Sequence, residues 1–138
     1  MNKKEAKILI VDDIEDNRYT LERSLKRDGF ENISLAECGK EALDLANKSK
    51  FDLILLDLMM PIMNGFEFLS EIKDTKIKSI PILVLTGADL DDNDKNFLKN
   101  ETEKVIHKTD DTVLSIAEEI NKVIKRTGKH DQNSVCIR

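Results

Sequence analysis

The run that decides the fold is Phe51-Asp52-Leu53-Ile54-Leu55-Leu56-Asp57-Leu58-Met59-Met60-Pro61. Its centre is a continuous apolar stretch of the length of a buried strand, and Asp57 stands at the end of it. A carboxylate in such an apolar segment costs on the order of several kcal/mol unless another group pairs with it. Asp57 is therefore the first candidate for a functional residue.

A second apolar run also ends in carboxylates. Lys7-Ile8-Leu9-Ile10-Val11 leads directly into Asp12-Asp13. Two buried strands that both end in acidic residues predict one acidic pocket at one edge of a sheet. An alternative is that Asp12 and Asp13 only cap the helix that follows, since Asp is a favoured N-cap residue.

Strand-like apolar runs alternate with amphipathic segments along the chain. The predicted strands are 7–12, 33–36, 51–57, 80–86 and 104–107, and the predicted helices are 15–28, 39–48, 65–74, 89–99 and 111–126. This alternation predicts a parallel sheet covered by helices on both faces. We expect an α/β, flavodoxin-like (βα)5 three-layer sandwich with strand order 2-1-3-4-5, whose ligands bind between strands 1 and 3.

Length and composition indicate a single soluble domain. The chain has 138 residues, 36% of them charged, and a net charge of −5, which argues against nucleic acid as the main partner. We see neither an apolar run of membrane-spanning length nor a secretory signal, so we expect no membrane contact and a cytoplasmic location. Cys38 and Cys136 are expected to be free thiols. Residues 1–126 are predicted to form the domain, and the polar residues 127–138 a disordered tail.

The polar residues that follow the predicted strands define a candidate site. They are Asp12, Asp13, Asp57, Thr86 and Lys108. Carboxylates that share a crevice repel one another and favour a cation, and Mg²⁺ prefers oxygen ligands and often shares its shell with a phosphate. Lys108 supplies a mobile positive charge and Thr86 a hydroxyl for a phosphoryl oxygen. Asp57 is then the nucleophile that accepts the phosphoryl group.

The chain resembles the receiver domain of two-component response regulators over residues 6–126. The resemblance rests on four motifs: Val11-Asp12-Asp13, Asp57-Leu58-Met59-Met60-Pro61-Ile62-Met63-Asn64-Gly65, Leu85-Thr86-Gly87, and Lys108. It implies that Asp57 takes a phosphoryl group from a phosphohistidine of a sensor kinase or phosphotransfer protein. It also implies a Mg²⁺ site and two phosphate-binding side chains. The implied roles are Mg²⁺ ligation for Asp12, Asp13, Asp57 and the Met59 carbonyl, the switch hydroxyl for Thr86, and phosphate binding for Lys108.

The sequence departs from the family pattern in three places. Thr109 replaces the usual proline after the lysine, so we expect a trans bond there. Val105 replaces the usual aromatic residue, so the usual coupling of that ring to Thr86 is not available. The stretch 96–104 lacks the common Ala-Gly-Ala turn and is more similar to receiver domains that work with hybrid sensor kinases.

The leading hypothesis is therefore a Mg²⁺-dependent phosphorylation switch that signals through protein contact and is not itself an enzyme. No pattern of a DNA-binding or catalytic domain follows residue 126, so we expect a downstream protein to contact the face of helix 4, strand 5 and helix 5. One alternative is an aspartyl-phosphate phosphatase, against which Met59 argues, because dehalogenase-type phosphatases carry an acid/base Asp there. Another is an interaction module that is never phosphorylated.

Overall fold

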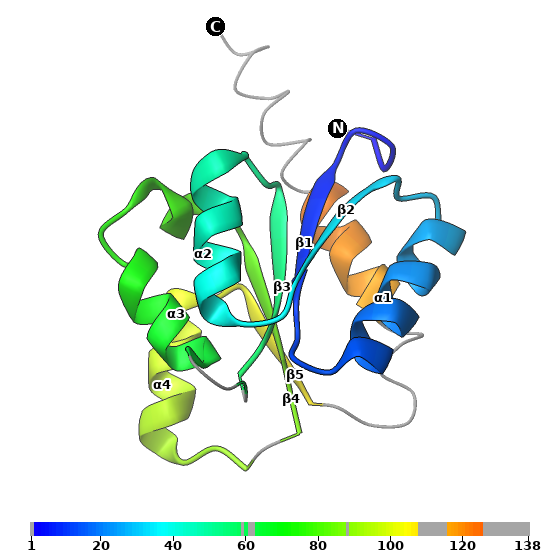
Figure 1. The fold of residues 1–138 in the computed structure, drawn as a ribbon. Helices are drawn as coiled ribbons and strands as arrows, with labels where there is room; N and C mark the ends of the chain where they lie inside the picture. Colours follow the sequence, from blue (N-terminus) through cyan, green and yellow to red (C-terminus); the bar gives the residue numbers. More distant parts are fainter. Residues whose placement is uncertain (1, 59, 61–62, 88, 108–115, 126–138) are drawn as a thin grey trace, which may run out of the picture.

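The computed structural model describes residues 2–58, 60, 63–87, 89–107 and 116–125. A five-stranded parallel sheet of order β2-β1-β3-β4-β5 forms the centre of the molecule (Figure 1). Its strands are β1 (Lys7–Val11), β2 (Asn32–Ala36), β3 (Leu53–Asp57), β4 (Ile82–Thr86) and β5 (Lys104–His107). The predicted flavodoxin-like order is confirmed.

Helices cover both faces of the sheet. They are α1 (Glu15–Arg27), α2 (Gly39–Lys48), α3 (Gly65–Ile72) and α4 (Asp92–Glu101), with a short 3-10 helix at Lys76–Ser79 and a further helical stretch at residues 116–125. In Figure 1, α1 and residues 116–125 (orange) lie on one side of the sheet, and α2, α3 and α4 on the other. The result is the predicted three-layer sandwich.

Alternate residues of each strand pack into two separate cores. Leu9, Ile54 and Val84 belong to the core under α2, α3 and α4. Ile8, Leu55 and Leu83 belong to the core under α1 and residues 116–125. Because successive strand side chains point to opposite faces, a strand buried on both sides is apolar throughout, as β3 and β4 are.

Several predicted elements have different bounds in the structure, and four of them differ by two residues or more at one end. The helix predicted at 89–99 begins later and is Asp92–Glu101, because the Asp91 side chain accepts from the Asp94 amide and caps it there. The helix predicted at 65–74 ends at Ile72 and a 3-10 turn follows. The strands predicted at 51–57 and 80–86 begin at Leu53 and Ile82.

Gly29 closes α1 in a conformation that favours glycine. Its φ is +109°, in the left-handed region. The Gly29 amide donates to the Lys26 carbonyl at 3.1 Å, and the Phe30 amide donates to the Leu25 carbonyl at 3.0 Å. This pair of bonds is a Schellman motif, and Leu25 and Phe30 pack into the same core. The turn thus directs the chain from α1 into β2.

Some predictions fall on residues outside the described part of the chain. They concern the tail at 127–138, Cys136, the Lys108–Thr109 bond and the first residues of the last predicted helix. Cys38 is a free thiol, as predicted. Among the described helices, none has the length and apolar composition needed to span a bilayer.

Candidate functional site

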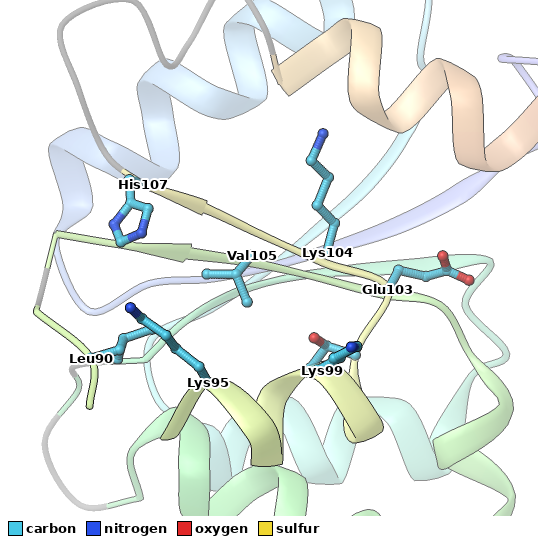
Figure 2. Close-up of a pocket in the computed structure, with 8 residues that line it drawn as sticks. Leu90, Lys95, Lys99, Glu103, Lys104, Val105 and His107 are labelled. Atoms are coloured by element: carbon cyan, nitrogen blue, oxygen red, sulfur yellow. The ribbon is translucent and has the colours of Figure 1, made fainter. Parts of the chain in front are cut away.

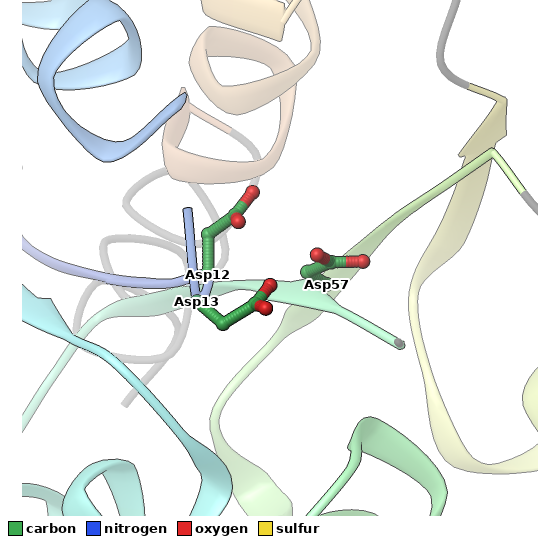
Figure 3. A group of neighbouring side chains, drawn as sticks. All are labelled: Asp12, Asp13 and Asp57. Atoms are coloured by element: carbon green, nitrogen blue, oxygen red, sulfur yellow. The ribbon is translucent and has the colours of Figure 1, made fainter. Parts of the chain in front are cut away.

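Three carboxylates meet where β1 and β3 end. Asp12 and Asp13 follow β1, and Asp57 is the last residue of β3. One carboxylate oxygen from each lies within 4.8 Å of the others, and Figure 3 shows the three side chains side by side. Asp12 is 1% exposed and Asp57 is 4% exposed, whereas Asp13 is open to solvent. The acidic pocket predicted from the two strand ends is thus present.

The register of the sheet explains why these residues meet. Val11 is paired with Leu56 on the neighbouring strand, so the residues that follow it arrive beside Asp57. The switch point of this sheet lies between β1 and β3, because β2 is on one side of β1 and β4 is on the far side of β3. Parallel α/β sheets bind ligands at such a point, outside the carboxyl ends of the strands.

The backbone around Asp12 is held on several sides. Its amide donates to the Ala36 carbonyl at 3.1 Å. Its Oδ1 accepts from the Ile14 amide at 3.0 Å. The N-cap residue of α1 is Ile14, with no side-chain cap bond, so neither aspartate serves as the cap of this helix. The structure therefore does not support the alternative in which the acidic pair is only a helix cap.

Arg18 is a residue of this region that sequence reasoning missed. It lies on α1 and is buried, and its Nη1 donates to the Asp12 carbonyl oxygen at 2.7 Å. Its Nη2 lies 3.5 Å from Glu37 Oε1, just after β2. The signal was its spacing: Arg18 shares the inner face of α1 with Leu21 and Leu25. A charged residue on the buried face of a helix indicates a specific partner.

Thr86 lies on the same rim as the acidic group. It is the last residue of β4, is fully buried, and is paired in register with His107 of β5. Asp57 is paired with Leu85, the residue before it. Thr86 and Asp57 are therefore the last residues of two neighbouring strands, as predicted. Lys108 and Met59 lie outside the described residues.

The segment after Asp57 is anchored to its surroundings at both ends. The Gly65 amide donates to the Leu58 carbonyl at 2.9 Å, and the Gly39 amide donates to the Met63 carbonyl at 3.0 Å. A Cβ on Gly65 would stand 2.8 Å from Leu58 Cα, so only glycine fits there. Asn64 and Glu67 form a reciprocal capping box at the start of α3.

The donor set suits a hard divalent cation. All three side chains offer carboxylate oxygens, which Mg²⁺ prefers, and the exposed position of Asp13 leaves room for waters and a phosphate on the open side. Three carboxylates this close together repel one another unless a cation or proton neutralises them. The residues present therefore fit a Mg²⁺ site.

Residues 8–120 match the response regulator receiver domain family. The chain therefore belongs to this family of phosphorylation-dependent switches in two-component signal transduction. It is similar to the response regulator MprA of Mycolicibacterium vanbaalenii, with 42% identity over 84 residues, which cover 61% of this chain and 36% of MprA. It is also similar to the cell cycle transcriptional regulator CtrA of Caulobacter vibrioides, with 32% identity over 133 residues, covering 94% of this chain and 54% of CtrA. The chain thus spans about a third to a half of these relatives.

Solved receiver domains share the fold. The receiver domain of a Francisella response regulator matches with a TM-score of 0.78 and 26% identity, covering 89% of this chain and 99% of that one. The Thermotoga maritima response regulator TrrA, solved in complex with Mg²⁺ and BeF, matches with a TM-score of 0.74 and 29% identity, covering 86% of this chain and 98% of that one. Both likenesses extend over nearly the whole of the compared domain.

Proposed function

We propose that Asp57 accepts a phosphoryl group from a phosphohistidine of a sensor kinase or histidine phosphotransfer protein. The observation that carries the proposal is the buried carboxylate of Asp57 beside Asp12 and Asp13 at the switch point of the sheet. A carboxylate oxygen of Asp57 attacks phosphorus and the P–N bond breaks. The bonding electron pair stays on the imidazole nitrogen of the donor.

The roles of the surrounding residues follow from charge. Asp12 and Asp13 would hold Mg²⁺, with Asp57 and the Met59 carbonyl as further ligands. The ion, when bound, neutralises charge on the transferring phosphoryl oxygens. The Thr86 hydroxyl would donate to a phosphoryl oxygen, and Lys108 would supply a positive charge to another. The complex of TrrA with Mg²⁺ and BeF supports this assignment by similarity of fold and family.

Arg18 orients the residues that would bind the ion. Its bond to the Asp12 carbonyl fixes the peptide between the two aspartates, and the bond from the Ile14 amide fixes one oxygen of Asp12. Site groups held by packed neighbours need little reorganisation when the ligand arrives. We therefore treat Arg18 as a positioning residue.

The protein acts in this proposal as a switch and not as an enzyme with turnover. Self-phosphorylation from a donor and slow self-dephosphorylation are its only reactions.

We further propose that residues 1–126 form the receiver domain, that the protein works in the cytoplasm, and that the phosphorylated form contacts a downstream protein through α4, β5 and the last helix. Neither nucleic acid nor a membrane is a proposed partner of this domain. The phosphatase and the permanently unphosphorylated module are the competing functions.

Labelling with a small phosphodonor tests the proposal. The purified protein is incubated with acetyl phosphate and either Mg²⁺ or excess chelator, and the intact mass is measured. We expect one added phosphoryl group with Mg²⁺ and none with chelator. Asp13→Ala should need far more Mg²⁺, whereas the control Asp16→Ala, on the exposed first turn of α1, should match the parent. Absence of labelling at any Mg²⁺ concentration, or continuous hydrolysis of a generic phosphate ester, would overturn the proposal.

A further inference from the structure

A hollow of about 310 Å³ lies between α4 and β5 (Figure 2). Leu90 and Val105 give it an apolar floor, and both also pack against the core under α4. Lys95, Lys99, Lys104 and Glu103 are among the residues around it. The hollow is therefore an apolar pocket with a charged rim.

The pocket exists because no large side chain of the described residues fills it. Val105, at its centre, is short and lies on a strand at the edge of the sheet. Phe97, the aromatic residue of α4, is not among the residues that line the pocket. Its ring packs against Phe66 of α3, with the ring centroids 6.1 Å apart. Leu98 is the only fully buried side chain of α4. Within the part of the chain that the structure describes, no side chain covers the apolar surface between α4 and β5.

The described residues that line the pocket carry a net positive charge, although the whole chain is acidic. Lys95 and Lys99 are one helical turn apart on α4, and neither has an ion pair within 4 Å among the residues that the structure describes. Lys104 pairs with Glu119 at 3.0 Å, on the other side of β5. Among the described residues that line the pocket, Glu103 supplies the single carboxylate. Two lysines are therefore available to an acidic ligand, in a protein whose net charge is −5.

We propose that this pocket binds an acidic segment of the downstream protein and takes one large apolar side chain from it. The apolar side chain would rest on Val105 and Leu90, and flanking carboxylates would meet Lys95 and Lys99. The inference rests on the proposed function for the choice of this face, and it adds the chemistry of the partner. The partner supplies the ring that this chain lacks at Val105.

A pair of synthetic peptides tests the inference directly. The probe is a short peptide of Asp and Glu with one central Phe, and its control carries Ala in place of the Phe. Both are titrated into the isotope-labelled protein, with and without beryllofluoride and Mg²⁺, while backbone amide shifts are recorded by NMR. We expect shifts at Leu90, Lys95 and Val105, and binding about tenfold weaker for the Ala peptide, as the loss of one buried aromatic side chain predicts.

Two sets of variants assign the binding to this pocket. The double variant Lys95→Glu/Lys99→Glu should bind the Phe peptide at least about fivefold more weakly than the parent, because two favourable charge contacts become repulsive. Lys40→Glu/Lys48→Glu makes the same change of net charge on α2 and should bind like the parent. Val105→Phe, which fills the hollow, should reduce the preference for the Phe peptide over the Ala peptide.

The outcomes separate this inference from the proposed function. Equal affinity for the two peptides, or an equal loss of affinity in both charge-reversed variants, would overturn the proposed peptide site even if Asp57 is phosphorylated normally. If the peptides bind as expected but the protein takes up no phosphoryl group, the result would support the peptide site and overturn the proposed function. Self-association that is lost in Lys95→Glu/Lys99→Glu, without peptide binding, would assign the surface to a second copy of the chain and overturn the proposal.

Discussion

Asp52 and Asp57 stand at opposite ends of the apolar run that forms β3. Asp52 lies outside the strand, where its side chain accepts from the Lys7 amide at 2.8 Å. Asp57 is the last residue of β3 and is almost completely buried beside two other carboxylates. Asp57 could be predicted from the sequence because it ends the apolar run and because Leu58 and Met59 follow it. The spacing of Arg18 with Leu21 and Leu25 indicates a buried arginine, but its partner is a backbone carbonyl, which no side-chain pattern identifies.

Replacement of Arg18 tests its role as a positioning residue. Arg18→Met leaves the Asp12 carbonyl without its buried donor, which should lower the free energy of unfolding by about 1–3 kcal/mol. It should also weaken Mg²⁺ binding, measured by calorimetry, because the loop that carries Asp12 and Asp13 loosens. Arg23→Met removes an exposed arginine that lies over the Tyr19 ring, and is the matched control. Unchanged Mg²⁺ affinity in Arg18→Met would show that Arg18 is only structural.

Met59 is expected to make the phosphorylated state long-lived, with decay over minutes to hours. It stands two residues after the acceptor, and a thioether neither orients nor activates an attacking water. Met59→Asn supplies an amide at that position and should accelerate loss of the phosphoryl group. The measurement is decay of purified phosphoprotein in excess Mg²⁺. Decay within seconds in the parent, or no acceleration in the variant, would count against this role.

The elements differ in how well the sequence predicts them. β3 and β4 are buried on both faces and are continuously apolar, so their pattern is plain even though their first residues were placed too early. α4 is the opposite case, with one fully buried side chain and an acidic first turn. The first residue of this helix depends on which of several aspartates caps it, and the spacing of apolar residues does not identify that aspartate. The structure assigns that cap to Asp91.

Hydrogen exchange should show that α4 is the least stable of the described helices on its face of the sheet. α3 buries Phe68, Leu69 and Ile72, whereas α4 buries Leu98 alone. Local opening is easiest where few apolar contacts hold an element. We expect faster exchange in α4 than in α3, and changes in α4 and β5 after addition of beryllofluoride and Mg²⁺. Changes confined to α1 and α2 would contradict a switch that works through α4 and β5.

At the scale of the whole molecule, the sheet order followed from the alternation of strands and helices, but the contacts that join distant segments did not. Asn121 donates to the Asp28 side chain at 2.9 Å, and Lys3 also pairs with Asp28 at 3.2 Å. Glu119 pairs with Lys104 of β5 at 3.0 Å. Asn121 and Glu119 thereby join the helix at 116–125 to the C-cap residue of α1 and to β5. These polar contacts link residues far apart in sequence, and no local pattern specifies them.

These contacts make stability depend on pH in the acidic range. The bond from Asn121, followed by contact with Lys3, holds the pKa of Asp28 below its ordinary value of 3.8. The bond from Lys104 likewise holds the pKa of Glu119 below 4.5. A carboxyl group whose pKa is lowered in the folded state stabilises the fold at pH values above its ordinary pKa. This stabilisation is lost as the pH falls through the pKa of the folded state.

Unfolding experiments at several pH values check this linkage. Asp28→Asn/Glu119→Gln should be less stable than the parent at neutral pH, and the difference should shrink as the pH falls below about 4. Asp44→Asn, on the exposed side of α2, serves as the control. A difference between parent and double variant that stays constant from neutral pH into the acidic range would contradict the assignment.

The most direct test of the central claim is to locate the phosphoryl group after transfer from a phosphohistidine donor. The parent, Asp57→Asn and Asp52→Asn are incubated with a phosphorylated histidine phosphotransfer protein and Mg²⁺, and the acyl phosphate is trapped by borohydride reduction before peptide mapping. Asp52 is the matched control, because it lies at the other end of the same apolar run and outside the acidic group. We predict modification at position 57 in the parent and in Asp52→Asn, and none in a folded Asp57→Asn. Labelling of Asp57→Asn at the level of the parent, or a trapped residue other than Asp57, would contradict the account.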